Sequence, residues 1–409
     1  MCTWITITEE QLPPEGVAAA MQREGVRDMN TLDQHYRRTG FLAFFLSGIC
    51  AISSGVIVSL LKDRYGLSFS MTGTLLSLLS IGNMAAGVLS GVLGERIGMR
   101  RTVLFLLPGY FVGYGLMSLF GAAGVLMAAF FLVGIAKGNA LNTCTVLVGN
   151  HTKNRARSMT AMHCCYAAGA LLCPFFISSL QGISPILPVL GVGAAGLLLW
   201  LLCLAAGLPT DNGGKQTGTG KTDLSFLKAP SFWILTALVF CQNAAEQSVN
   251  GWLVTYFRNE GILTGALSAY TITIMWGATL AGRLLIAFAF RIRNIFRALT
   301  VMGAFCTVLY LFLVQAKTPV TAILALFAFA FAMSGVNPLA VAGVGEQMSA
   351  VSMGILLPVS GIGAIVMPLL IGILADSIGL RAGMAANLVP CIGMFVLSLV
   401  MALRTKGQA

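Results

Sequence analysis

A charged loop, "GVLGERIGMRR" (residues 91–101), lies between two long apolar segments of the chain. These segments cover residues 69–92, which include the start of the loop, and 102–121. Each has the roughly 20 residues that a helix needs to cross the hydrocarbon core of a bilayer. The pattern therefore predicts two membrane-spanning helices joined by a short charged turn.

Similar apolar segments recur along the chain of 409 residues. The sequence is 57% hydrophobic and only 10% charged, with a mean hydropathy of +0.86, whereas a soluble domain is about 25% charged. These values predict an all-α polytopic membrane protein. Windows of about 20 residues predict twelve transmembrane helices: 40–61, 69–92, 102–121, 123–149, 158–180, 184–207, 231–257, 264–288, 297–316, 319–343, 350–374 and 382–403.

The net charge of +11 is unevenly distributed. If the N-terminus is placed in the cytosol, most of the 25 basic residues fall on the cytosolic side. This asymmetry is the positive-inside pattern of membrane proteins. It predicts a multi-pass protein of the cell inner (plasma) membrane with both termini cytosolic, and it explains the excess charge without a nucleic-acid partner. Because no cleavable signal peptide precedes the first span, residues 1–39 are expected to form a cytosolic tail.

A polar stretch, "PTDNGGKQTGTGKTDLSFLKAP" (residues 209–230), divides the spans six and six. Its composition predicts a flexible cytosolic linker over 208–230, between six-helix bundles at 40–207 and 231–404, with a tail at 405–409. The stretch is not a phosphate-binding loop, because Lys215 occupies the position of the first required glycine. The ten cysteines show no metal-ligand spacing. We therefore expect no metal and no cofactor.

The loop at 91–101 resembles the signature loop of the major facilitator superfamily, roughly Gly-x-x-x-Asp-Arg-x-Gly-Arg-Arg. Glu95 stands for the family's Asp, and Met99 for the first residue of its final basic pair. Gly91 is expected to let the end of the second span pack closely, and Glu95 to cap a helix or bind an arginine. The resemblance implies a conformational gate made of Gly91, Glu95, Arg96, Gly98, Arg100 and Arg101.

Two further stretches echo this loop. "GRLLIAFAFRIRN" (282–294) occupies the equivalent place in the second half, and "GILADSIGLR" (372–381) precedes the last span on the other side of the membrane. Recurrence at corresponding places indicates an internally duplicated transporter. The resemblance implies two pseudo-symmetric six-helix bundles around a central cavity, which spans one, four, seven and ten line.

Three further stretches resemble one particular family within this superfamily. "ARSMTAMHCCYAAGALLCP" (156–174), "EQSVNGWLVTYF" (246–257) and "GIGAIVMPLLIGILAD" (361–376) are similar to the fifth, seventh and eleventh spans of the fucose/glucose/galactose–proton symporter family and its sodium-coupled relatives. This resemblance implies a secondary active transporter that imports a sugar with protons, or with sodium, by alternating access.

Glu246 is the only acidic residue near the middle of a predicted span. Placing an ionisable group there is costly, so such a group usually faces a cavity and serves a function. Burial disfavours the carboxylate and a nearby cation favours it, so a site that balances the two can take up and release a proton. The alternative is a structural hydrogen-bonded contact between helices. The helical period places other polar residues on the same face: Gln242, Asn243, Gln247 and Asn250.

Lys137 lies in the fourth span, with no acid within ten residues on either side. We expect it to face the central cavity and to form a salt bridge with Glu246 in one conformational state, broken when a proton or the substrate arrives. A permanent structural pair is the alternative. Asn139 and Asn142 lie around the helix from Lys137 and are expected to bind a neighbouring helix instead. Gly134 and Gly138 are expected to allow close helix packing.

His163, Asn337 and Trp276 are further candidates for substrate or proton binding. His163 can relay protons or bind hydroxyl groups, or serve only as a hydrogen bond between helices. Asn337 and Trp276 are equally consistent with packing. Trp252 lies off the face that carries Glu246, and is expected to pack or to line a gate.

Two features make a neutral sugar less favoured. The first span carries only serines where sugar–proton symporters often have an acid, and the fourth carries Lys137. A sugar acid or another carboxylate fits this cavity better. An exporter of drugs or metabolites, and a non-transporting sensor, remain alternatives. No catalytic constellation is found, so an enzyme is not expected. The predicted protein is a monomer whose partners are a small molecule, protons and the bilayer.

Overall fold

The computed structural model describes residues 15–152, 155–209, 225–263, 265–288, 292, 294–343 and 350–406. Every regular element within these ranges is a helix. This confirms the predicted all-α class. The predicted linker falls largely on residues 210–224, which lie outside the described ranges, as do residues 1–14.

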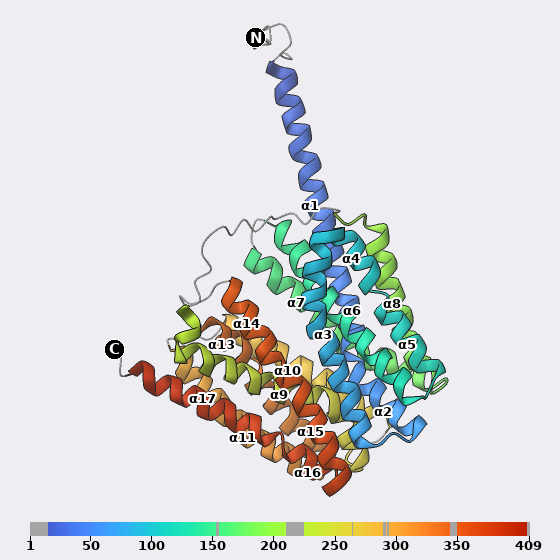
Figure 1. Cartoon of the computed structure of the whole chain (residues 1–409), viewed down its shortest axis with the longest axis vertical. Coiled ribbons are helices and arrows are strands. Elements are labelled where there is room, and N and C mark those ends of the chain that lie inside the picture. Colours follow the sequence, from blue (N-terminus) through green and yellow to red (C-terminus); the bar gives the residue numbers. More distant parts are fainter. Residues whose placement is uncertain are drawn as a thin grey trace.

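Six crossings lie in the first half of the chain, and Figure 1 shows how their helices are arranged. The first and third crossings are each built from two helices. The elements are α1 (Glu15–Ile52), α2 (Ser54–Tyr65), α3 (Phe69–Ile97), α4 (Met99–Leu106), α5 (Gly109–Leu119), α6 (Ala123–Asn150), α7 (Arg155–Gln181) and α8 (Leu187–Ala205).

The second half makes six more, and its last three crossings are each built from two helices. The elements are α9 (Pro230–Asn259), α10 (Tyr270–Phe288), α11 (Ile295–Gln315), α12 (Pro319–Met333), α13 (Val336–Ala342), α14 (Ala350–Gly361), α15 (Gly363–Ile378), α16 (Leu380–Ala385) and α17 (Leu388–Lys406).

Ten crossings within the described residues are long and apolar enough to span a bilayer. α9 and α10 complete the twelve. α9 is long but less apolar, because the polar face predicted around Glu246 lies in its middle. In α10, the apolar part that is described ends at Ile286. α9, which is long but has no fully apolar stretch of membrane-spanning length, is therefore a helix that carries the candidate site.

Breaks within the crossings have local chemical causes. At the α1–α2 break, the Ser53 hydroxyl donates to the carbonyl of Cys50 (2.8 Å) and also bonds the Tyr114 hydroxyl (2.9 Å). A serine that bonds a preceding carbonyl competes with the helix and tends to bend it. Between α4 and α5 the break falls at Pro108, which has no backbone N–H to donate.

α1 begins well before the first predicted span. It is continuous from Glu15, so the described part of the predicted tail is helical. His35 and Tyr36 bond the carbonyls of Ala206 and Gly207, at 3.1 and 3.3 Å. These bonds hold this part of α1 against the end of α8.

The repeated loop motif has a repeated backbone geometry. Gly98, between α3 and α4, has φ 82° and ψ 159°. Gly379, between α15 and α16, has φ 92° and ψ 154°. Both amides bond a carbonyl four residues back, at 3.1 Å. Only glycine adopts such angles without strain. The equivalence supports the internal duplication expected from the sequence; the third copy, at 282–294, lies partly outside the described residues.

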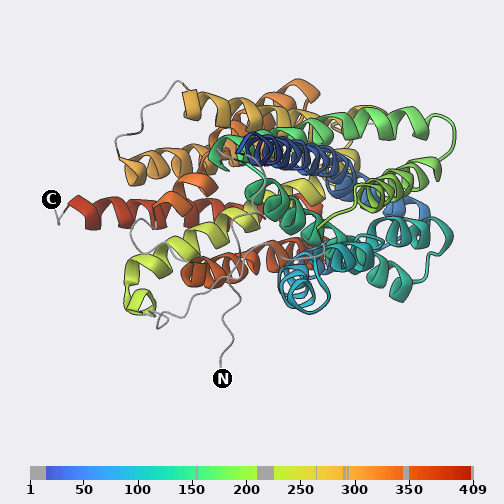
Figure 2. The same ribbon diagram turned by 90° about the horizontal axis from the view of Figure 1, so that it is seen from above.

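The two halves lie side by side and approach each other at one face (Figures 1 and 2). Twelve crossings return the chain to the side where it started, so we call that side the terminal face and the other the opposite face. Near the opposite face, Gly55 of α2 lies directly against the carbonyl of Asn250 in α9. Gly73 of α3 lies so close to Pro368 of α15 that an added Cβ would be 2.6 Å from its carbonyl oxygen.

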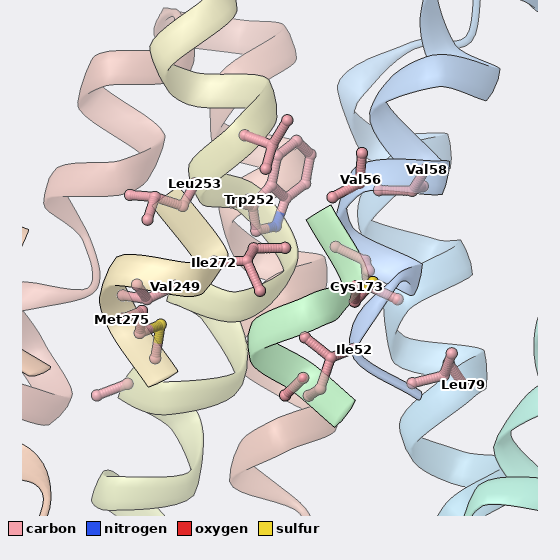
Figure 3. Packing of buried hydrophobic residues seen from close by; sticks show 14 of the residues in the cluster. Ile52, Val56, Val58, Leu79, Cys173, Val249, Trp252, Leu253, Ile272 and Met275 are labelled. Atoms are coloured by element: carbon pink, nitrogen blue, oxygen red, sulfur yellow. The ribbon is translucent and has the colours of Figure 1, made fainter. Parts of the chain in front are cut away.

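A buried apolar layer joins the halves beside these close approaches. Figure 3 shows Ile52 and Val56 from the first half on one side of Trp252 from the second, with Val249 and Met275 on its other side. Trp252 is completely buried, and its indole N–H donates to the carbonyl of Pro368 at 3.0 Å. Trp252 therefore packs α9 against α15, in agreement with its expected position off the polar face.

Candidate functional site

A small cavity lies between the two halves, with a volume of about 20 Å³. This is room for about one water molecule. Five of its lining residues are polar or charged, and they come from both halves: Ser54, Ser80, Lys137, Gln247 and Asn250. The rest of the lining comes from Ala51, Ile52, Leu76, Leu79, Gly251 and Pro368.

Lys137 reaches this cavity from α6, and its side chain is half-buried. Gly134 and Gly138 press against the carbonyls of Leu79 and Asn83 in α3, so α6 and α3 pack backbone to backbone as the sequence predicts. Because this contact fixes one face of α6 against α3, Lys137 is held toward the interior between the halves.

Asn139 points away from the cavity, as the helical period predicts. It is fully buried, and its amide donates to the Ser90 hydroxyl of α3 at 2.9 Å. This bond confirms that Asn139 joins α6 to a neighbouring helix.

Glu246 sits within a hydrogen-bonded chain. Asn337 of α13 donates to Gln242 Oε1 at 2.8 Å, and Gln242 Nε2 donates to the Glu246 carboxylate. Gln242 is only 1% exposed. The structure thus brings together three predicted site residues from the seventh and tenth crossings, although Asn337 and Gln242 lie 95 positions apart in the chain.

Lys137 and Glu246 are close without forming an ion pair. The Glu246 carboxylate acts electrostatically on Lys137 and on Tyr166. The ion pairs within 4.0 Å among the described residues are Arg258–Asp63 and Arg381–Glu260. In this conformation the predicted Lys137–Glu246 salt bridge is therefore not made.

Residues on the polar face of α9 lie in two different environments. Asn243 donates to the Ser360 hydroxyl of α14 at 3.4 Å, which lies inside the second half. Gln247 and Asn250 instead line the cavity with Lys137. The side-chain oxygen and nitrogen of Asn250 are buried and have no hydrogen-bond partner in the described structure. Such unmade bonds are costly, so Asn250 is well placed to bind a water or a solute.

An aromatic group joins α1, α7 and α10. Tyr166 packs edge-on against Trp276, with ring centroids 5.8 Å apart. It also packs against Phe44 in a tilted arrangement, with centroids 4.8 Å apart. The buried Trp276 Nε1 has no partner in the described structure. The His163 side chain is exposed, and its ring centroid lies 5.5 Å from that of Phe44. The positive charge of Arg283 acts electrostatically on it. The structure thus places His163 and Trp276 in one group, apart from the small cavity.

The predicted gate loop is partly described. Arg96 and Arg101 are exposed, Arg100 is half-buried, and nothing is described of the Glu95 side chain. The expectation for Gly91 is wrong in this conformation, because an added Cβ would meet no atom within 4 Å. This face of α3 therefore meets no neighbouring helix at Gly91 in the present conformation, in which the halves are joined at the opposite face.

The halves are instead joined by charged residues at the opposite face. Asp376 accepts hydrogen bonds from the backbone amides of Phe69 (2.8 Å) and Ser70 (2.7 Å), at the start of α3. Acids are favourable at helix N-termini. Arg258 and Asp63 form a second link, with 2.7 Å between Nη2 and Oδ2. Both links cross between the two halves of the chain.

The sequence of residues 40–357 matches the family model of the major facilitator superfamily. The chain belongs to the major facilitator superfamily. Membership makes it a multi-pass membrane transport protein and not an enzyme. Within its described residues, no group of three or more His, Cys, Asp or Glu side chains is arranged to hold a metal ion.

Superfamily transporters with curated names share parts of this sequence. The 4-hydroxybenzoate transporter PcaK of Pseudomonas aeruginosa is 31% identical over 145 residues, which are 34% of this chain and 31% of that protein. PcaK of Acinetobacter baylyi is 32% identical over 142 residues, which are 34% of this chain and 31% of that protein. An uncharacterised transporter of Yersinia pestis is 27% identical over 53% of this chain and 56% of that protein. The chain thus matches about a third to a half of each relative's length.

Solved superfamily structures share the fold over nearly the whole chain. The nucleoside transporter NupG superposes with a TM-score of 0.74 at 14% identity, covering 92% of this chain and 99% of that one. A second solved structure is that of a bacterial homologue of the human lysosomal transporter Spinster, in an inward-facing and occupied conformation. It superposes with a TM-score of 0.68 at 13% identity, covering 91% of this chain and 96% of that one. At these identities the likeness shows the fold alone.

Sequence reasoning missed Ser54 and Ser80 as lining residues and Phe44 as part of the aromatic group. Serines are common in the transmembrane helices of this chain, and Phe44 lies in an unbroken apolar run. No local signal distinguishes these residues from packing residues, because their position depends on which helices become neighbours.

Proposed function

We propose that this protein is a secondary active transporter for a small hydrophilic anion, such as a sugar acid or a related carboxylate. The observation that carries the proposal is Lys137. It places an ammonium group in a polar cavity between the halves, and no carboxylate of the described residues lies within 4.0 Å of it. A cation without an ion-pair partner inside a membrane protein is a natural partner for an anionic solute.

Neutral donors around Lys137 suit the same ligand. The Ser54 and Ser80 hydroxyls of the lining already donate to the carbonyls of Ala51 and Leu76, so the donors that suit an anion are the side-chain amides of Gln247 and Asn250. The amide of Asn250 has no partner in the described structure. Charge-assisted hydrogen bonds from such groups are about twice as strong as neutral ones. The names of two relatives, both 4-hydroxybenzoate transporters, also favour an organic acid over a neutral sugar.

We assign proton coupling to Glu246. Its carboxylate has a hydrogen-bond donor in Gln242 and lies within electrostatic reach of Lys137. A substrate anion at Lys137 weakens the attraction between Lys137 and Glu246, so the substrate and the Glu246 carboxylate compete for one ammonium group. In another state the two side chains form the predicted salt bridge, and breaking a buried pair costs about 3–5 kcal/mol, enough to shift an alternating-access equilibrium.

The remaining expectations complete the proposal. The distribution of basic residues supports a cell-membrane protein with its terminal face in the cytosol. With that orientation, the present conformation, joined at the opposite face, is inward-facing. Two six-helix bundles at 40–207 and 231–404, joined by a linker at 208–230, then rock against each other in a monomer.

Uptake into proteoliposomes tests the proposal. The panel comprises neutral sugars, sugar acids and other carboxylates, including 4-hydroxybenzoate, each with and without an imposed pH or sodium gradient. We expect an anion to accumulate when the side from which it enters is acidic. Lys137→Gln should abolish uptake of that anion, and Lys137→Arg, which keeps the charge, should retain part of it. Accumulation of neutral sugars that Lys137→Gln leaves intact would contradict the anion proposal.

The coupling proposal has its own test. Glu246→Gln should allow exchange of substrate across the membrane but abolish accumulation driven by a pH gradient. Accumulation that persists in this variant would exclude Glu246 as the proton site. Accumulation driven by sodium at equal pH would identify sodium as the coupling ion. Export, the alternative direction, would appear as accumulation in vesicles of inverted orientation.

A further inference from the structure

A second polar pocket lies at the opposite face, between α2 and α9, with a volume of about 260 Å³. Three of its lining residues come from each half of the chain, and all six are polar or charged. They are Ser59, Lys62 and Asp63 of α2, and Thr255, Arg258 and Asn259 of α9. This lining is therefore not suited to an apolar or aromatic ligand.

The charges of the pocket are unequal. Arg258 pairs with Asp63 at 2.7 Å, so these two largely offset each other. Lys62 makes no ion pair within 4.0 Å among the described residues, and its ammonium rests over the Phe69 ring, 4.3 Å from the centroid. Asp376 acts on Lys62 from nearby, but both of its carboxylate oxygens accept backbone amides of α3. The pocket therefore keeps one positive charge that has no ion-pair partner among the described residues.

Two buried hydroxyl groups belong to the same lining. Ser59 is 1% exposed and accepts a hydrogen bond from Arg258 Nη1 at 3.3 Å, which leaves its own proton available. Thr255 is 4% exposed, and its Oγ1 has no hydrogen-bond partner in the described structure. A buried hydroxyl without a partner is destabilising. Its presence beside a cationic pocket indicates a ligand that supplies the missing acceptor.

We infer that this pocket binds a small oxyanion, either a carboxylate or a phosphate, between Lys62 and Arg258. Such an ion offers several acceptor oxygens, to which Lys, Arg and hydroxyl donors are suited. Cations are disfavoured by the net charge. The site is distinct from the cavity around Lys137, which has a separate lining, and it does not depend on what the central cavity transports.

Binding at this pocket has a conformational consequence. Lys62 belongs to the first half of the chain and Arg258 to the second, so a bound oxyanion joins the two halves at the face where they already meet. A ligand shifts a conformational equilibrium by its difference in affinity for the two states. An oxyanion on the opposite side thus stabilises the conformation described here.

Thermal unfolding of the purified full-length protein in detergent tests the inference, because a ligand specific for the folded state raises the unfolding midpoint. The probes are sodium acetate, sodium phosphate and sodium chloride at one ionic strength. The background is Lys137→Gln, which removes the central cation. We expect acetate or phosphate to raise the midpoint in a saturable manner, and whichever ion does so identifies the class of ligand.

Three variants on that background locate the site. Lys62→Gln and the isosteric Thr255→Val should each weaken the apparent affinity about tenfold, whereas Arg64→Gln, which removes a neighbouring cation outside the lining, should leave it unchanged. Thr255→Val removes an unpartnered hydroxyl and should fold normally. The inference would be overturned if chloride raised the midpoint as much as the oxyanions do, or if neither oxyanion raised it in a saturable manner. It would also be overturned if Arg64→Gln weakened the apparent affinity as much as Lys62→Gln does. A response that Lys137→Gln abolishes would place the anion at the central site, which rejects this pocket while supporting the proposed function.

Discussion

The side chain of Asn337 donates a 2.8 Å hydrogen bond to Gln242, which in turn donates to Glu246. The tenth crossing therefore orients the carboxylate that lies in the seventh. Because Gln242 is almost completely buried, its oxygen depends on this one donor within the described structure.

Replacing Asn337 should therefore affect both stability and coupling. Asn337→Ala leaves the Gln242 oxygen buried without its donor, and such a loss costs about 1–3 kcal/mol. We expect a lower unfolding midpoint and weaker pH-driven accumulation at unchanged substrate exchange. The matched control is Asn243→Ala, whose hydrogen bond to Ser360 is 3.4 Å long and lies away from Glu246. Equal effects of both variants would contradict an orienting role for Asn337.

Asp376 should control how tightly the opposite face closes. Asp376→Ala removes the acceptor of two backbone amides at the start of α3, and loss of such a cap costs about 0.5–2 kcal/mol. We expect the population to shift toward the conformation that is open at this face, measured by distances between labels on the ends of α3 and α15. Ser377→Ala, at the exposed neighbouring residue, should not change the distances. Unchanged distances in Asp376→Ala would show that the cap does not hold the halves together.

A methyl group at position 55 should prevent closure of the opposite face. An added Cβ on Gly55 would overlap the carbonyl of Asn250 in the other half. We therefore expect Gly55→Ala to fold normally but to transport at least tenfold more slowly. Gly87→Ala is the control, because a Cβ there meets no atom within 4 Å. Normal transport by Gly55→Ala would mean that the halves do not need this approach.

Asn139 is predicted to stabilise the first half without affecting coupling. Its amide donates to Ser90 from a fully buried position. Asn139→Ala should lower the free energy of unfolding by about 1–3 kcal/mol and leave the ratio of accumulation to exchange unchanged in the protein that folds. A change in that ratio at normal stability would instead place Asn139 in the transport site.

Much of the fold was predictable because it depends on local properties. Length and hydropathy define the crossings, and the period of the α-helix predicts that Gln242, Glu246 and Asn250 share one face. The helical period also predicts that Asn139 and Lys137 point in different directions. These predictions need no knowledge of which helices are neighbours.

The site required tertiary information that no local pattern contains. A helical wheel shows the direction of Asn243 and Asn250, but it does not show that one binds Ser360 while the other lines the cavity. Asp376 was found within a repeated motif, but its role as a cap depends on the start of α3 lying next to the end of α15. Gly91 is not closely packed in this conformation, and a helical pattern cannot show in which state of the transporter such a contact forms.

The contact between Gly55 and the carbonyl of Asn250 also bears on leakage. Where two helices meet through main-chain atoms, no side chain can change rotamer to let a proton or a water molecule pass. The barrier can then be lowered only by moving whole helices, which is the same motion that exposes the binding site. Permeability and turnover are thereby tied to one movement, so a protein built in this way opens a path across the membrane only when its helices move.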